Sequence, residues 1–228
     1  MDASENTWWT LVNTAAAGDT EARETFAATY IGVVRAYLAA RWRGGPMVNE
    51  LDDAVQETFV ECFREGGALQ RVQGPAQGRF RTFLFAVARN VGRRFEEKRS
   101  RDRKRHTSDS LHESQFENND EHASRAFDRA FAETVVARAA HRQLTAAQEA
   151  GDAAIRRVEL LRLRFQDDLP IRDIAKQWNE DAAFVHHEYA RAREEFRKAL
   201  ISELTFQNPD ATVTEIEEEC VSLLQMLE

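Results

Sequence analysis

The chain has 228 residues, of which 43% are hydrophobic and 31% charged, and its formal net charge is −8. Its length suits one large domain or two small ones, and its composition excludes a wholly disordered chain, a collagen-like chain and a small disulfide scaffold. No apolar run approaches the roughly 20 residues that span a bilayer, and the acidic N-terminus lacks the pattern of a secretory signal. We therefore expect a soluble, cytoplasmic protein with no membrane partner.

The two cysteines, Cys62 and Cys220, lie far apart within apolar patterns of helical spacing. In a reducing compartment such residues are more often buried thiols than a disulfide. We expect both to be free.

Positive charge is concentrated in one segment of the chain. Residues 71–105 carry 12 basic and 3 acidic side chains, whereas residues 201–228 carry 7 acidic side chains and no basic ones. A solvated helix face explains a few like charges, but this block indicates a local basic surface that the overall charge conceals.

Apolar residues at helical spacing predict an all-α fold along nearly the whole chain. Asp19 is the predicted N-cap of a helix that continues to Leu38. Gly44-Gly45-Pro46 ends this pattern, a second helix covers 51–63, and a third runs from 79 to 99.

A polar segment without periodicity, 101–122, predicts a flexible linker. It would divide an N-terminal helical domain at 7–100 from a C-terminal helical domain at 123–204. Within the latter, a helix at about 153–165 carries a stripe formed by Ile155, Val158, Leu161 and Phe165.

The acidic segment 205–228 forms a predicted helical extension. Thr214 with Glu217 has the spacing of a capping box, and an apolar stripe follows at Ile216, Cys220, Leu223, Leu224 and Leu227. Two interpretations stay open. The extension either docks on a basic, apolar patch and restrains access to DNA, or completes the core of its domain.

Catalytic and metal-binding patterns find little support in the sequence. It has no glycine-rich phosphate loop, nucleophile elbow or Cys-x-x-Cys motif. His186 and His187 are adjacent, so on a helix they point about 100° apart and do not share one ion in the usual way. We expect a protein that is not an enzyme and has no catalytic residues, bound metal or cofactor.

The segment 170–200 has the pattern of a helix-turn-helix. A short helix ends near Trp178, Asp181 is a predicted N-cap, and a second helix carries basic and aromatic residues. In this motif the second helix enters the major groove of DNA, with its N-terminal residues toward the base edges. Its predicted base-facing residues are Phe184, His186, His187, Ala190 and Arg191, with Glu188 as an acceptor for cytosine and Arg172 and Lys176 on phosphates. The alternative is an ordinary helical hairpin.

The helix at 79–99 interleaves cations with aromatic residues. Cations neutralise phosphates, and exposed aromatic rings stack on the bases of separated strands. Its candidate nucleic-acid residues are Arg79, Phe80, Arg81, Phe85, Arg89, Asn90, Arg93, Arg94, Lys98 and Arg99. Core packing is an equally good interpretation for Phe80 and Phe85.

The helix at 51–63 carries an acidic face opposite its apolar stripe. That face consists of Asp52, Asp53, Gln56, Glu57 and Glu61. It does not favour DNA, so it is either plain solvent-exposed surface or a docking surface for a basic protein.

These motifs together resemble a known family. Asp52-Asp53-x-x-Gln-Glu-Thr-Phe59, then Phe80-Arg-Thr-Phe-Leu84 and Ala88-Arg-Asn90, resemble the second conserved region of bacterial extracytoplasmic-function sigma factors. Leu169-Pro-Ile-Arg-Asp-Ile-Ala175 and the segment from Val185 to Arg193 resemble the fourth region. The resemblance covers about residues 7–200 in the family's order.

The resemblance implies a protein that binds core RNA polymerase and directs it to promoters. Asp52, Asp53, Gln56, Glu57 and Phe59 fall where the family contacts the β′ clamp helices. Residues that fall at the −10 element are Arg79, Phe80, Arg81, Arg89, Asn90, Arg93, Arg94 and Arg99. Residues that fall at the −35 element are Arg172, Lys176, Phe184, His186, His187, Ala190, Arg191 and Arg193. Further implied partners are the polymerase β flap, promoter DNA and, as an open question, an anti-sigma factor.

The sequence departs from the family at Phe184, where a small polar residue is usual. Two other classes of function are alternatives: a free-standing helix-turn-helix regulator that binds duplex DNA as a dimer, and an all-helical protein-interaction adaptor. Co-purification with core polymerase distinguishes a sigma factor from the free-standing regulator. Measurable DNA binding at low salt excludes the adaptor.

Overall fold

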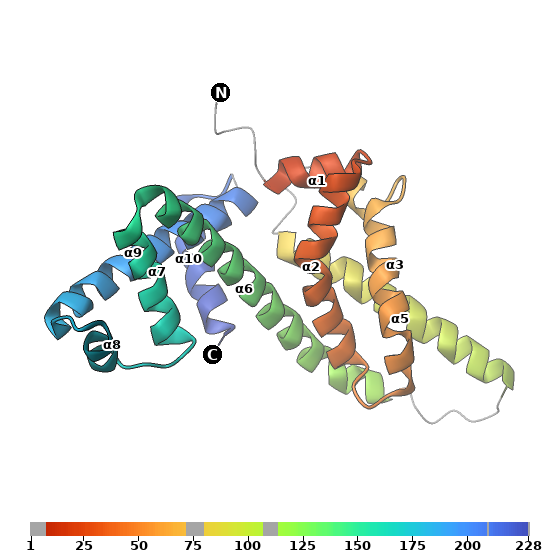
Figure 1. Ribbon diagram of the computed structural model, residues 1–228. Helices are drawn as coiled ribbons and strands as arrows, with labels where there is room; N and C mark the ends of the chain where they lie inside the picture. Colours follow the sequence, from red (N-terminus) through yellow and green to blue (C-terminus); the bar gives the residue numbers. More distant parts are fainter. Residues whose placement is uncertain (1–7, 72–79, 107–113, 209, 228) are drawn as a thin grey trace. The chain divides into compact units, whose positions relative to one another are not determined.

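The computed structural model describes residues 8–71, 80–106, 114–208 and 210–227, and every regular element in these ranges is helical (Figure 1). The elements are α1 (Trp8–Ala16), α2 (Thr20–Arg41), the 3-10 helix η1 (Pro46–Glu50), α3 (Leu51–Phe63), α4 (Ala68–Arg71), α5 (Phe80–His106), α6 (Ser114–Ala150), α7 (Asp152–Phe165), α8 (Ile171–Trp178), α9 (Ala182–Gln207) and α10 (Val213–Gln225). The all-α prediction is thus confirmed. None of the described helices combines the length and apolar character needed to cross a membrane.

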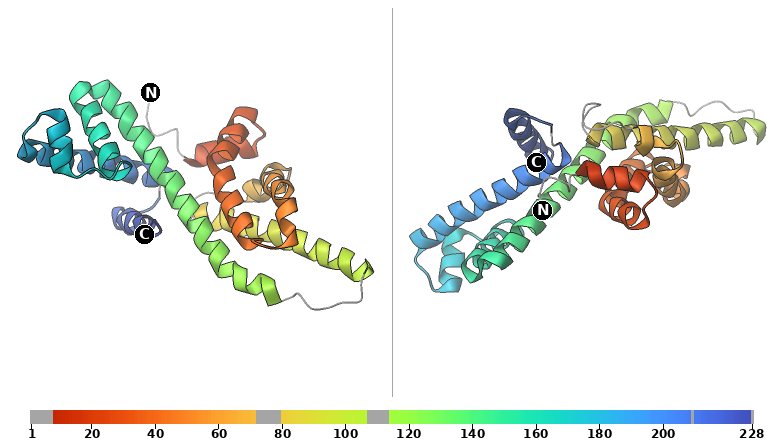
Figure 2. Two further views of the ribbon diagram at one scale, coloured as in Figure 1. Left: turned by 60° about the horizontal axis from the view of Figure 1, so that its bottom comes forward. Right: turned by 90° about the horizontal axis from the view of Figure 1, so that it is seen from above.

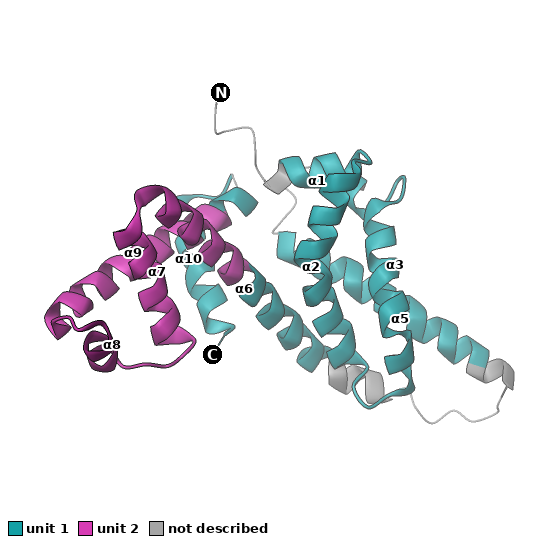
Figure 3. Ribbon diagram, viewed as in Figure 1, with its two compact units in different colours: residues 1–134, 205–228 teal, residues 135–204 magenta. Residues whose placement is uncertain are grey.

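The chain forms two compact units. Unit 1 contains residues 1–134 and 205–228, and unit 2 contains residues 135–204 (Figure 3). The division therefore falls inside α6, which Figure 2 shows as one uninterrupted helix. It does not fall in the predicted linker at 101–122.

The predicted linker is largely helical where the structure describes it. Helix α5 continues to His106 and α6 begins at Ser114, while 107–113 lie outside the described residues. The first half of α6 stays with unit 1 because its apolar residues are buried there, namely Ala123, Phe127, Phe131 and Ala132. The polar composition of 101–122 indicates a linker because the apolar stripe of α6 begins only at Ala123.

An aromatic core holds unit 1 together. Tyr30 of α2 lies 5.0 Å from Phe80 of α5 and 6.0 Å from Phe131 of α6, measured between ring centroids. Tyr37, about two turns further along α2, packs edge-on against Phe127 at 6.3 Å. Each such ring pair adds about 0.5–1.5 kcal/mol beyond the burial of its area, so α2, α5 and α6 are fixed to one another.

Helix α2 begins as predicted. The Asp19 side chain accepts a hydrogen bond from the backbone N–H of Ala22 at 2.8 Å, which satisfies one of the unpaired donors at the helix start. Both cysteines are free and buried, as expected. Burial raises the pKa of the Cys62 thiol to about 12, so this thiol stays protonated at neutral pH.

Unit 2 has its own apolar core. It consists of Leu160, Leu163, Ile171, Ile174, Ala175 and Val185, with Leu169, Trp178 and Tyr189 packed against it. The predicted stripe of α7 is wrong by one position, because the buried residues are Ala154, Arg157, Leu160 and Leu163, whereas Phe165 is 69% exposed. An ion-paired arginine occupies one buried position, and a pattern of apolar residues alone misses it.

Helix α10 belongs to unit 1 and starts two residues before the predicted box. Its capping box joins Thr212 and Glu215, because the Thr212 side chain accepts from the Glu215 N–H and the Glu215 carboxylate accepts from the Thr212 N–H. Leu224, placed in the predicted stripe, is exposed. The buried positions are Ile216, Glu219, Cys220 and Leu223.

Candidate functional site

Helices α8 and α9 form the helix pair that the sequence predicts. Asn179 ends α8 with a left-handed backbone (φ 53°), a conformation that asparagine tolerates better than most residues. Asp181 then caps α9, since its Oδ1 accepts hydrogen bonds from the N–H groups of Ala183 at 2.8 Å and Phe184 at 3.2 Å. The turn between the two helices is therefore set by local chemistry.

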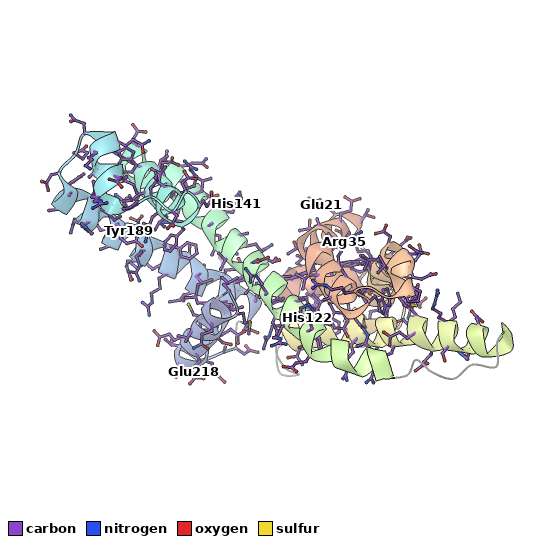
Figure 4. All side chains as sticks on the ribbon, turned by 90° about the horizontal axis from the view of Figure 1, so that it is seen from below. Glu21, Arg35, His122, His141, Tyr189 and Glu218 are labelled. Atoms are coloured by element: carbon purple, nitrogen blue, oxygen red, sulfur yellow. The ribbon has the colours of Figure 1, made fainter. Side chains whose placement is uncertain are left out.

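All residues predicted to contact duplex DNA except Glu188 are exposed on this pair. They are Arg172, Lys176, Phe184, His186, His187, Ala190, Arg191 and Arg193. Val185 and Ala192 on the same helix are buried, so the predicted surface and the core lie on different faces of α9. The guanidinium of Arg193 lies 5.8 Å from the ring centre of Tyr189, which is labelled in Figure 4.

Glu188 is not available to accept from cytosine as predicted. Its carboxylate accepts a hydrogen bond from Arg157 of α7 at 3.2 Å and another from Arg191 at 3.2 Å. Arg157 also donates to Glu195 at 2.8 Å, and these hydrogen bonds to Glu195 raise the pKa of Arg157. Glu188 therefore holds α9 against α7, a role that sequence reasoning missed because the partner lies 31 residues away.

Phe80 does not offer a stacking surface for bases. Its side chain is only 1% exposed and its ring lies 5.8 Å from Phe26 and 5.0 Å from Tyr30. Phe85 is half-buried, 5.2 Å from both Tyr37 and Phe127. The core interpretation of these rings is correct, because α5 must fill the gap between α2 and α6.

Three of the predicted nucleic-acid arginines on α5 are paired with carboxylates of unit 1. Arg81 lies 2.9 Å from Asp128 and Arg89 lies 3.4 Å from Asp120, both on α6. Arg94 lies 3.2 Å from Glu61, and 3.7 Å from Glu57, on α3. The basic helix thus carries much less free positive charge than its composition indicates.

Other predicted residues of this group differ in exposure. Asn90, Arg93 and Lys98 are exposed on α5, and Arg99 is half-buried. Arg79 lies outside the described residues. The open strip of α5 is therefore centred on Asn90 and Arg93.

Helix α3 presents most of its predicted acidic face, but the Glu61 side chain is only 14% exposed and pairs with Arg94. Asp52, Asp53 and Gln56 are exposed and Glu57 is partly exposed, whereas Phe59 is buried with its ring 6.3 Å from Phe26. Phe59 therefore offers little surface to a docked partner and mainly packs α3 against α2.

Between α2 and α3 lies an open groove of about 630 Å³. Phe59 lines it together with the exposed apolar residues Ile31 and Val60. Arg35 of α2, labelled in Figure 4, forms an ion pair with Asp52 at one side of this groove. Sequence reasoning missed Ile31 and Arg35 because they belong to a different helix from the acidic face.

A buried polar network fixes α5 against α2. Arg41 donates to both oxygens of Glu96 at 2.6 and 2.9 Å, and it also pairs with Asp120. The indole N–H of Trp42 donates to Glu96 at 2.8 Å. Burial raises the pKa of Tyr37, which accepts from Arg41, to about 12. This network positions α5 against α2.

Among the described residues, His, Cys, Asp and Glu side chains do not form groups of three that could hold a metal ion.

A scan against models of known protein families matches none of them to this chain, and a search of curated proteins finds no significantly similar one. Function is therefore inferred from the residues and geometry of the chain itself.

Proposed function

We propose that the protein is a sigma factor, which binds core RNA polymerase and directs promoter-specific transcription initiation. The observation that carries this proposal is the α8–α9 pair. Asp181 caps α9, and the eight residues that were assigned to the −35 element are all exposed on the pair. In a helix-turn-helix such residues contact phosphates and base edges, which here would be those of the −35 element.

The surface of α3 supports a polymerase partner. Asp52, Asp53 and Gln56 are exposed beside an apolar groove that Ile31 and Val60 line. A rim of charge around an apolar centre is the usual anatomy of a protein interface. A free-standing DNA-binding regulator does not need such a surface.

The open strip of α5 supports contact with the −10 element. Asn90 and Arg93 are exposed, and an arginine can neutralise a phosphate of a single strand. Because Phe80 is buried and Phe85 packs on Tyr37 and Phe127, these two rings have no part in this proposal beyond holding the helix in place.

The test is in vitro transcription with purified core polymerase from the organism that encodes the chain. New transcription starts that share two spaced upstream elements, and that appear only when the protein is added, support the proposal. A protein that fails to bind core polymerase but binds duplex DNA is the free-standing regulator. A protein that binds neither is the adaptor.

Two variants divide the proposed roles. The Asp53→Ala/Gln56→Ala double variant should weaken binding to core polymerase at least about thirtyfold, which corresponds to the roughly 2 kcal/mol of one lost interface hot spot. Arg93→Ala should leave that binding unchanged and reduce promoter opening. Equal loss of polymerase binding in both variants would contradict the assignment of α3 and α5 to different partners.

A further inference from the structure

The ion pairs of α5 follow a pattern that its sequence does not show. Three arginines on this helix each lie close to a carboxylate from another helix of unit 1. Arg81 and Arg89 face α6, and Arg94 faces α3. The carboxylates thus lie along two sides of α5, and between them the helix exposes Asn90 and Arg93.

These pairs are accessible to a competing anion. The side chains of Arg81 and Asp128 are 22% and 33% exposed, and Arg94 is about half exposed. Ion pairs that remain in contact with water are weaker than fully buried ones, so a phosphate can displace the carboxylate. The pair nevertheless lowers the affinity, because the binding phosphate must replace an existing partner.

We propose that carboxylates of α3 and α6 restrain nucleic-acid binding by α5, by holding Arg81, Arg89 and Arg94 in ion pairs that a phosphate must displace. This inference rests on the proposed function of α5 as a nucleic-acid surface. As a consequence, the protein should have a low affinity for DNA as long as these ion pairs are intact.

Met226 adds a second contact at Arg81. A nitrogen of the Arg81 guanidinium lies 3.6 Å from the Met226 sulfur, just after α10, and the same nitrogen donates to Asp128. The C-terminal segment therefore contacts Arg81, the least exposed of the three arginines. This contact is consistent with the interpretation that the acidic extension restrains access to DNA. The contact lies on α5, and both partners belong to unit 1.

Asp128→Asn in the full chain tests the proposal most directly. Asp128 pairs with Arg81, whereas Asp120 also pairs with the buried Arg41 and its removal would disturb the core. Glu133→Gln is the matched control, because Glu133 lies on the same helix and pairs at 3.1 Å with the exposed Arg129 instead of with α5. Both substitutions remove one negative charge.

The probe is a fluorescein-labelled single-stranded DNA of about 12 nucleotides, and its fluorescence anisotropy is measured over a range of salt concentrations. Asp128→Asn should bind about two- to fivefold more tightly than the unmodified chain, the range of one exposed ion pair. The slope of log affinity against log salt should steepen by about 0.7, the value for one additional phosphate contact on a single strand. Glu61→Gln should tighten binding through Arg94 by a smaller factor, because Glu57 still lies 3.7 Å from this arginine. Glu133→Gln should change affinity less than about 1.5-fold.

The outcomes separate the two proposals. If Asp128→Asn and Glu133→Gln change affinity equally, the restraint is refuted and only net charge matters. An Arg81→Ala variant in which Asp128→Asn still tightens binding also overturns it. If the DNA affinity of the unmodified chain does not depend on Arg93, the proposed role of α5 fails first. Unfolding by urea shows that each variant is folded, and an unfolded Asp128→Asn is replaced by Glu61→Gln.

Discussion

The cations of α5 and those of α8–α9 differ in where their partners lie. Arg81, Arg89 and Arg94 of α5 pair with carboxylates 31 to 47 residues away, on other helices. Arg172 and Lys176 share Asp173, and Arg191 pairs with Glu188, so these pairs lie within one turn of a single helix. A local pair leaves its helix face open, whereas a distant pair covers the face with another helix.

The difference shows that basic composition alone does not measure a nucleic-acid surface. The segment 71–105 is the most basic of the chain, yet three of its arginines have partners on α3 or α6. The α8–α9 pair has fewer cations, and all its predicted contact residues except Glu188 are exposed.

The largest effect should come from the buried arginine of unit 1. Arg41 is 4% exposed and binds both oxygens of Glu96. Arg41→Ala would leave a buried carboxylate without its cation, at a cost of about 3–5 kcal/mol. Urea unfolding measures this loss. The exposed Arg43→Ala is the control, and similar losses in both variants would show that Arg41 has no special structural role.

Unit 2 contains several distant ion pairs, among them those of Arg138 and Arg142 with the buried Glu203. The pairs of Arg157 should behave like those of unit 1. Arg157 is 9% exposed and joins α7 to Glu188 and Glu195 of α9. Because its partners are partly exposed, Arg157→Ala should cost less than a fully buried pair, about 2–4 kcal/mol. Arg191→Ala removes the other cation at Glu188, from an exposed position, and should cost less than about 1 kcal/mol. Equal urea midpoints for the two variants would contradict this distinction.

Alkaline pH should weaken unit 1 through Tyr37. Burial raises the pKa of Tyr37 from 10.0 to about 12, so between these pH values the folded state keeps a proton that the unfolded state has lost. The free energy of unfolding therefore falls as pH rises through this window, by about 2–3 kcal/mol. Tyr37→Phe should flatten the pH dependence between pH 10 and 12, when unfolding is measured at each pH. A slope equally steep in Tyr37→Phe would assign the effect to other groups.

The smallest effect compares neighbouring arginines of α5. Arg93 is exposed, and Arg94 is paired with Glu57 and Glu61. Arg93→Ala should reduce affinity for single-stranded DNA about three- to tenfold at low salt, while Arg94→Ala should reduce it less than about twofold, because its phosphate contact competes with an existing pair. Anisotropy titrations measure both. A larger loss of affinity for Arg94→Ala than for Arg93→Ala would contradict the weaker contribution expected of a paired arginine.

Local chemistry in the sequence determined several features of this protein. Asp19 and Asp181 were predicted as caps, and both accept hydrogen bonds at the starts of α2 and α9. The α8–α9 pair and the exposed acidic face of α3 followed from helical spacing. These predictions succeeded because caps, turns and helix faces depend on residues within a few positions of one another.

Only the tertiary structure decided which faces meet. It buried Phe80, paired Arg94 with Glu61, placed Arg157 in the core of unit 2 and kept the first half of α6 in unit 1. Periodicity shows that a helix has two faces, but it does not show which distant helix covers each face. Contacts between residues 30 or more positions apart depend on how the helices pack, and this packing decided how much of the basic helix remains open to a partner.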